Sequence, residues 1–308
     1  MAKYILKRLL MLIPVILGVT FIVFSIMYMT PGDPAQMMLG ENAPEEAVEA
    51  LREEMGLNDP FLVQYFRFIG NAARGNFGRS YISKKEVVPE IIGRFPATLQ
   101  LAFFGVLIAI IIGIPVGIIS ATRQYSIFDS VSMFFALLGV SMPNFWQGLM
   151  LILIFAVNLR WLPSSGYGSF QHIILPALTL GTSAAAIITR MTRSSMLEVI
   201  RQDYIRTARA KGVAENKVII KHALKNALIP VITVVGLQFG YLLGGAVLTE
   251  TVFSWPGIGR LLVEAIRQKD TPMVQACVIF IAVTFSIVNL AIDILYAFID
   301  PRIKSQYK

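Results

Sequence analysis

Long blocks of apolar residues alternate with polar segments along this chain, and polar residues do not recur inside the blocks at helical or strand spacing. A helix needs about 20 apolar residues to cross the roughly 30 Å hydrocarbon core of a bilayer. Six blocks reach or approach that length, at residues 9–29, 97–121, 131–159, 173–191, 228–248 and 274–298. The pattern predicts an all-α polytopic membrane protein with about six transmembrane helices.

Proline and glycine inside these blocks do not cancel the prediction, because neighbouring helices can satisfy the backbone groups that they free. Gly113 and Gly117 form a G-x-x-x-G pattern, which allows another helix to approach closely. The first block follows Lys3, Lys7 and Arg8, as the apolar core of a signal peptide would. Its apolar core is too long for a signal peptide, and it lacks a small-x-small cleavage site, so we expect a retained membrane helix.

The polar segment 31–96 carries two amphipathic helical patterns. Pro44, Glu45 and Glu46 suit a first helical turn, and Gly56 suits a stop. The apolar positions of the first pattern are Val48, Leu51 and Met55, and those of the second are Phe61, Tyr65, Phe66 and Ile69. We interpret both as helices that lie on the membrane or on the spans, with a dedicated substrate site as the alternative.

Composition agrees with a membrane protein, since 56% of the residues are hydrophobic and only 15% are charged. An ordinary soluble domain has about a quarter charged residues. The net charge of +8 is distributed unevenly when the N-terminus is placed inside. The inner side then holds 16 Lys and Arg against 6 acidic residues, and the outer side 11 against 13. Basic residues concentrate in cytoplasmic loops, so the charge indicates topology and not nucleic-acid binding.

This topology gives four predicted regions. Residues 1–30 form an N-terminal transmembrane helix, and residues 31–96 an extracytoplasmic loop with amphipathic helices. Residues 97–299 form a core of five transmembrane helices, which includes a cytoplasmic loop at 192–227. Residues 300–308 form a cytoplasmic tail, so both termini are expected in the cytoplasm.

The inner loop around residues 201–230 reads as helix, glycine, helix. Asp203 favours a first turn, Arg209 and Lys211 suit a last turn, and Gly212 suits a left-handed cap. Thr207, Ala208 and Ala210 are small, so the tip of this helix can enter a groove on a partner. The alternative from the residues alone is an ordinary basic loop held near anionic lipid.

The loop resembles the signature loop of binding-protein-dependent ABC-transporter permeases, in the dipeptide, oligopeptide and nickel branch. Arg206-Thr207-Ala208 stands where the general pattern has E-A-A, and Gly212 matches its glycine. The Glu is absent, and Pro230 closes the motif later than in the general pattern. The same branch is similar in order at Pro31-Gly32-Asp33-Pro34, Gly75-Asn76-Phe77-Gly78, Gly139 to Trp146, Trp255-Pro256-Gly257-Ile258-Gly259 and Asp300-Pro301-Arg302.

This resemblance implies a type I ABC-importer permease fold in a bacterial or archaeal cytoplasmic membrane. The partners it implies are a second homologous permease, two cytoplasmic ATPase subunits and an extracytoplasmic substrate-binding protein. The chain contains no G-x-x-x-x-G-K-[ST], so ATP and Mg²⁺ are expected in the ATPase subunits, with no cofactor in this chain. The residues expected to couple to the ATPase are Asp203, Tyr204, Arg206, Thr207, Ala208, Lys211 and Gly212.

Other polar residues in the blocks have structural interpretations beside functional ones. Asn289 and Asp293 in the last span, with Ser141 and Asn144, are candidates for the translocation path. For Asp293 a structural hydrogen bond is the simpler interpretation, and Arg190 and Arg193 read as positive-inside residues. Glu250 and the turn 255–259 predict a loop that dips back at the outer face, with Trp255 at headgroup level.

The sequence argues against catalytic and metal chemistry. Cys277 lies in an apolar run and is expected to be a small buried residue, and His172 and His222 have no ligand spacing. The serines in the spans have no His in register and no G-x-S-x-G, which disfavours an intramembrane protease. A proton-coupled transporter would need several ionisable groups at mid-bilayer, and a membrane scaffold is the remaining alternative. We predict import of short peptides, with glutathione and nickel as alternative cargoes.

Overall fold

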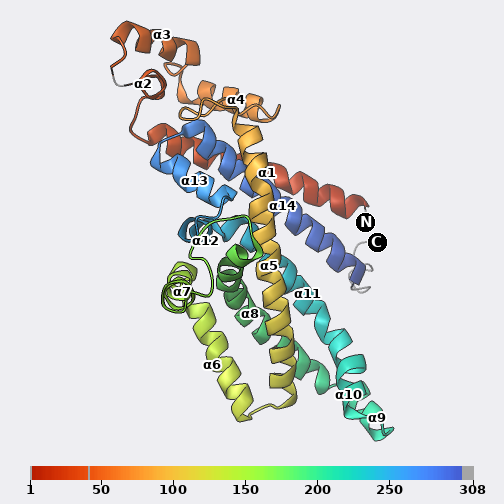
Figure 1. Ribbon diagram of the computed structural model, residues 1–308. Coiled ribbons are helices and arrows are strands. Elements are labelled where there is room, and N and C mark those ends of the chain that lie inside the picture. The colour runs from red at the N-terminus through yellow and green to blue at the C-terminus, as the bar shows by residue number, and fades with distance from the viewer. Residues whose placement is uncertain (1, 41, 300–308) are drawn as a thin grey trace.

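The computed structural model describes residues 2–40 and 42–299, and the described chain is helical apart from turns and one isolated β-bridge (Figure 1). The predicted tail 300–308 and its Asp300-Pro301-Arg302 motif lie outside the described residues. In chain order the helices are α1 (Ala2–Met29), α2 (Pro34–Leu39), α3 (Glu45–Met55), α4 (Phe61–Ala72), α5 (Val87–Thr122), α6 (Ile127–Ser141), α7 (Asn144–Leu151), the π-helix η1 (Ile152–Asn158), α8 (Phe170–Ile200), α9 (Asp203–Ala210), α10 (Glu215–Lys217), the π-helix η2 (Val218–Leu224), α11 (Lys225–Gly245), α12 (Val247–Val252), α13 (Ile258–Arg267) and α14 (Thr271–Ile299).

Five helical stretches are long and apolar enough to cross a membrane; they contain the predicted spans 9–29, 97–121 and 173–191 and overlap most of 228–248 and 274–298. The predicted span 131–159 is not one straight helix, because α6 and the α7–η1 stretch meet at 106°. Pro143 causes the break: the residue before a proline is driven out of the helical region, and Met142 is extended, with φ −78 and ψ 129. Together with this bent pair the described chain has up to six spans.

The centre of the fold is the contact between α5 and α8, which pack along most of their lengths. Gly113 and Gly117 make it possible, as their G-x-x-x-G spacing predicted. A Cβ on Gly113 would lie 2.9 Å from the carbonyl oxygen of Ala185, and one on Gly117 would lie 2.8 Å from that of Thr189. The backbones of the two helices therefore touch where any larger side chain would separate them.

The segment between α1 and α5 forms the helices that its apolar patterns predicted. Helix α3 ends at Gly56, which has φ +67, and α4 packs its aromatic side chains on the C-terminal half of α1. Tyr65 is buried against Phe21 and Phe24, but Phe66 is 67% exposed, so Phe66 does not belong to the packed stripe. The contacts support the interpretation that α4 lies on a membrane span.

The turn between α12 and α13 holds Trp255 inside the protein, so this side chain is not an exposed anchor, and its headgroup level stays a prediction. Trp255 is only 1% exposed, and its indole nitrogen donates a 2.8 Å hydrogen bond to the carbonyl oxygen of Ala97 in the N-terminal part of α5. The turn can fold inward because Gly257 has no Cβ. A Cβ at this position would overlap the carboxyl group of Glu250. Trp255 is thus part of the core that joins α5, α8 and α11.

The carboxyl group of Glu250 organises that turn. It accepts hydrogen bonds from the Thr98 hydroxyl at 2.7 Å and from the backbone nitrogen of Arg260 at 3.0 Å, in the first turn of α13. Burial raises the pKa of Glu250, while these donors act to lower it. A carboxyl group at the amino end of α13 satisfies helix donors that would otherwise be unpaired.

Candidate coupling site

Helix α9 carries the residues that the sequence analysis assigned to coupling, and nearly all of them are exposed. Asp203 begins the helix, as predicted, and its side chain is 98% exposed. Tyr204, Arg206, Thr207, Lys211 and Gly212 are also exposed, while Ala208 is partly buried. The helix and the glycine after it therefore present a continuous surface of polar, basic and small residues.

Gly212 ends α9 with the left-handed cap that the sequence predicted. It has φ +75, a value that glycine adopts with little strain. The backbone nitrogen of Gly212 donates to the carbonyl oxygen of Arg209 at 2.9 Å, and that of Val213 donates to the carbonyl oxygen of Ala208 at 3.2 Å. These two bonds form a Schellman motif, which satisfies carbonyl groups at the end of the helix and fixes the direction of the chain.

Ile205 is the buried side chain of α9 and its main connection to the body of the protein, and Ala208 packs against the same cluster. It is fully buried and lies in a cluster with Ala121 of α5, Met196 of α8, Val218 of η2 and Ala227 of α11. Ile205 was not among the residues predicted from the sequence, although an apolar residue among charged ones on a short helix was the available signal. Because the cluster joins the ends of α5, α8 and α11, a displacement of α9 reaches three spans at once.

Weaker polar contacts support this position. Arg209 forms an ion pair with Glu215, whose closest nitrogen–oxygen distance is 2.7 Å, across the Gly212 turn. The amide of Asn226 donates to the Tyr204 hydroxyl at 2.8 Å. These groups are exposed, and each such contact contributes at most about 1 kcal/mol. The buried Ile205 is therefore the main attachment of α9.

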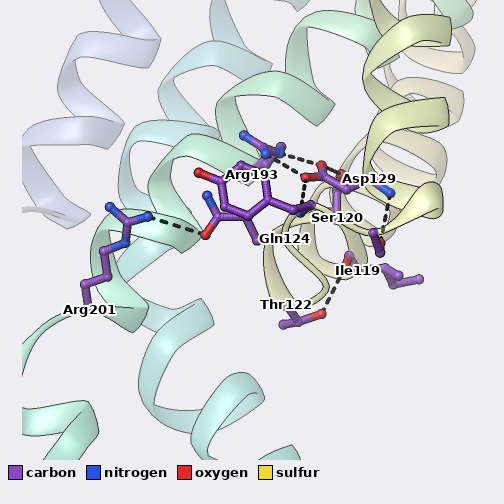
Figure 2. Close-up of polar contacts among 9 residues, drawn as sticks. Ile119, Ser120, Thr122, Gln124, Asp129, Arg193 and Arg201 are labelled. Carbon is purple, nitrogen blue, oxygen red and sulfur yellow. Dashed lines mark hydrogen bonds and ion pairs between the residues drawn. The ribbon is translucent and has the colours of Figure 1, made fainter.

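A buried ion pair lies beside this site, where α6 begins (Figure 2). The guanidinium of Arg193 on α8 donates to both oxygens of Asp129, at 2.6 and 2.7 Å, and Asp129 is 3% exposed. The Ser120 hydroxyl and the backbone nitrogen of Tyr125 also donate to Asp129. The sequence suggested only a positive-inside role for Arg193. In the structure Arg193 also pairs with Asp129, and this pair fixes the first turn of α6 against α8.

The four residues proposed for the translocation path fall in two separate places. Ser141 ends α6 and Asn144 begins α7, so they flank the 106° bend. Asn289 and Asp293 lie on α14 and line a cavity of about 240 Å³ with Leu12 and other residues of α1 and α14. Ser141 and Asn144 do not line that cavity, so the structure does not gather the four residues into one site.

Neither metal nor thiol chemistry is supported within the part of the chain that the structure describes. No group of three His, Cys, Asp or Glu side chains there is placed to hold a metal ion. Cys277 is fully buried, as predicted for a small apolar residue. The described chemistry is therefore that of helix packing, together with the exposed polar surface of α9.

Comparison with known proteins places these features in a family. Residues 113–305 match the binding-protein-dependent transport system inner membrane component, and residues 1–102 match the N-terminal part of such membrane components. The chain belongs to this permease family. It is thus a multi-pass inner-membrane transport subunit, and the transporter also contains ATPase subunits and a binding protein. This membership decides against the proton-coupled, protease and scaffold alternatives.

Two relatives match the permease over its length. It is 50% identical to the dipeptide transport system permease protein DppB of Alkalihalophilus pseudofirmus, over 99% of this chain and 100% of that protein. It is 46% identical to the glutathione transport system permease protein GsiC of Escherichia coli K12, over 99% of each.

Solved structures confirm the type I importer fold. The permease resembles a chain of the inward-facing MetNI methionine ABC transporter with a TM-score of 0.58 and 21% identity, over 68% of this chain and 96% of that one. It resembles a chain of an amino acid ABC transporter with a TM-score of 0.52 and 15% identity, over 70% and 94%. These similarities concern the fold.

Proposed function

We propose that the permease forms the membrane path of an ATP-driven importer for short peptides, and that α9 receives the movement of an ATPase subunit. Two relatives support the cargo, since one is named for dipeptide transport and the other for glutathione, which is itself a short peptide. Dipeptide is the first choice because that relative is the more similar of the two. Nickel has no support among the described side chains.

The observation that carries the coupling role is the contrast within α9. Its outward surface is exposed and small enough to enter a groove, while Ile205 is fully buried in a cluster shared by three spans. A rigid, well-capped helix with one strong attachment transmits a displacement better than a flexible loop does. Asp203, Tyr204, Arg206, Thr207 and Lys211 are the proposed contacts with the ATPase, and they come from the exposed surface.

We propose an orientation from the charge distribution together with the positions of the short helices. Helices α2 and α3 lie at one end of the molecule, and α9 and α10 lie at the other (Figure 1). The end with α9 carries the excess of basic residues, so we place it in the cytoplasm together with both termini. Helices α2 to α4 then face the binding protein on the outer side.

A second permease, homologous to this one, is proposed to complete the path. Helix α6 presents Phe134, Phe135 and Leu137, each more than half exposed, although α6 belongs to the bent membrane pair. Ser141 and Asn144 lie at the bend between α6 and α7. This position suits residues that line a path between two subunits. The exposed aromatic face supplies area for packing against the partner.

Uptake by the complete transporter in inverted or reconstituted vesicles tests the cargo and the energy source together. Labelled dipeptide should accumulate only with ATP and binding protein, vanadate should abolish accumulation, and a proton uncoupler should leave it unchanged. Excess unlabelled glutathione should compete weakly. Strong competition by glutathione with no dipeptide uptake would assign the permease to glutathione instead.

A variant pair tests the coupling role. Ala210→Trp adds bulk to the exposed tip of α9, whereas Ala50→Trp adds the same bulk to an exposed position of α3 at the other end of the molecule. We expect Ala210→Trp to leave the complex assembled in the membrane but to reduce uptake for each ATP hydrolysed, and Ala50→Trp to keep that ratio. Wild-type coupling in Ala210→Trp would contradict the assignment of α9.

A further inference from the structure

An apolar cavity of about 450 Å³ lies between α1, α4, α5 and α14. Thr20 is the only polar side chain that lines it, and its hydroxyl is already bonded to the carbonyl oxygen of Leu17. Helices α1 and α14 are both membrane spans. Ile13 and Leu17, which line the cavity, are 53% and 43% exposed, so it opens to the surface of these spans. Within a bilayer that surface meets lipid and not water.

A second cavity, of about 430 Å³, adjoins the first. The two share Gly75, Phe77 and Val88 in their walls. The second cavity is lined by the loop after α4, by Glu86 just before α5 and by Val88 in its first turn, and its charged side chains are Arg79 and Glu86. An apolar chamber in the membrane thus continues into a polar chamber built from a loop.

Arg79 and Glu86 face each other across an isolated antiparallel β-bridge, yet their side chains do not pair. Within residues 2–40 and 42–299 neither side chain makes an ion pair or a hydrogen bond, and both are exposed to the polar chamber. Opposite charges on neighbouring strands ordinarily attract and meet. Two unpaired charges of opposite sign in one cavity are complementary to a ligand that carries both signs.

The two chambers are arranged along the direction that a lipid takes in the membrane. On α14 the lining runs from Ala276 to Val283, and on α1 from Thr20 to Ile13. Each stretch covers eight residues, and the seven steps between its ends span about 10 Å of helix. Ala276 and Val88 lie near the ends of their helices that adjoin α4 and the polar chamber, and Ile13 and Val283 lie deeper in the spans. A head in the polar chamber would send its acyl chain inward along α1 and α14.

We propose that the joined chambers bind one phospholipid with a zwitterionic aminoethyl phosphate head, from the leaflet next to α2–α4. The guanidinium of Arg79 binds the phosphate, since its planar fork matches phosphate oxygens. The carboxylate of Glu86 accepts a hydrogen bond from the primary ammonium. One acyl chain fills the apolar chamber and packs α4 against α1 and α14. The lipid is a structural ligand of the permease and is distinct from its cargo.

The chemistry of the chamber selects this head over other phospholipids. A glycerol head offers Glu86 no cation, and it adds no charge that the cavity complements. A choline head offers a cation but no N–H donor, so the carboxylate of Glu86 gains no hydrogen bond. The amide of Asn76, which also lines the polar chamber, accepts from the backbone nitrogen of Gly78 and so shapes the loop around the head.

The test uses the complete transporter, extracted in mild detergent and washed until bulk lipid is lost. Bound phospholipid is then extracted and counted by mass spectrometry, after reconstitution in nanodiscs of ethanolamine-, choline- or glycerol-headed lipid. We expect about one ethanolamine lipid for each copy of this chain. Arg79→Gln and Glu86→Gln should each reduce retention about tenfold, as expected for loss of one charge-assisted contact.

Two further variants make the result specific. Arg74→Gln removes an exposed guanidinium five residues before Arg79 that lines neither chamber, and it should retain the lipid. Ile13→Trp fills the apolar chamber from an exposed position and should displace the lipid without altering the charges. The proposal is overturned if washed transporter holds no phospholipid, if Arg79→Gln and Arg74→Gln retain it equally, or if Glu86→Gln leaves the preference for ethanolamine heads unchanged.

Discussion

Ile205→Ala should separate ATP hydrolysis from transport without altering the exposed surface of α9. Ile205 is fully buried at the cluster that joins α9 to α5, α8 and α11. Truncation of a buried isoleucine to alanine costs about 2–5 kcal/mol. The exposed contacts of Tyr204 and Arg209 contribute at most about 1 kcal/mol each, so they cannot hold α9 in place. The variant therefore loosens α9 while the proposed ATPase contacts stay chemically the same.

Hydrogen exchange and coupled assays measure the two halves of this prediction. A loss of 2–3 kcal/mol corresponds to a roughly 30- to 150-fold faster exchange of the α9 amides. Uptake for each ATP hydrolysed should fall, while ATPase activity itself persists. Ile205→Val keeps most of the buried volume and costs only about 0.5–1.5 kcal/mol, so its effect should be intermediate.

Ile220→Ala is the matched control, because Ile220 lies nearby in η2 but is 65% exposed. It makes the same chemical change without opening a cavity. Equal behaviour of Ile205→Ala and Ile220→Ala, or unchanged exchange in α9 after loss of Ile205, would refute the reasoning that one buried side chain connects α9 to the spans.

Three further substitutions have defined outcomes. Gly257→Ala places a Cβ 2.2 Å from the buried carboxyl of Glu250, and such overpacking should cost at least about 1–3 kcal/mol, seen as a lower melting temperature. Asp129→Asn should cost about 3–5 kcal/mol because it leaves Arg193 without its charged partner, and a double-mutant cycle with Arg193→Met should show strong coupling. Burial raises the pKa of Glu250, so the protonated carboxyl group is favoured in the folded protein. The stability that it contributes is fully present below the pKa of the unfolded chain and declines as the pH rises through the pKa of the folded protein. Glu250→Gln should remove this part of the pH dependence of the melting temperature.

Features that depend on neighbouring residues were accessible from the sequence. The length and apolarity of the spans follow from the bilayer thickness, and five of the six predicted spans coincide with or overlap helices long enough to cross a membrane. Gly212 could be placed as a cap because a Schellman motif involves only the last turn and the two residues after it. The same holds for Gly56 at the end of α3.

Features that depend on distant residues were not accessible. Asp129 and Arg193 are 64 positions apart, and nothing local indicates that they pair. The bend at Pro143 was hidden because hydropathy records apolarity and not direction. Trp255 was placed at the headgroups by its amphipathic chemistry, but its ring nitrogen finds Ala97 in the core, 158 positions away. These contacts are decided by packing between spans, which one sequence does not reveal.

The backbone contact between α5 and α8 limits which parts of the permease can move. Gly113, Gly117 and Gly181 let the backbone of one helix reach the carbonyl groups and the β-branched side chains of the other, and a one-residue register shift would press Cβ atoms into those groups. The pair is therefore a rigid body in any transport cycle. Sliding or rotation has to occur at interfaces formed by flexible side chains, such as that between α11 and α14, where Gly236 faces the branched tip of Ile292.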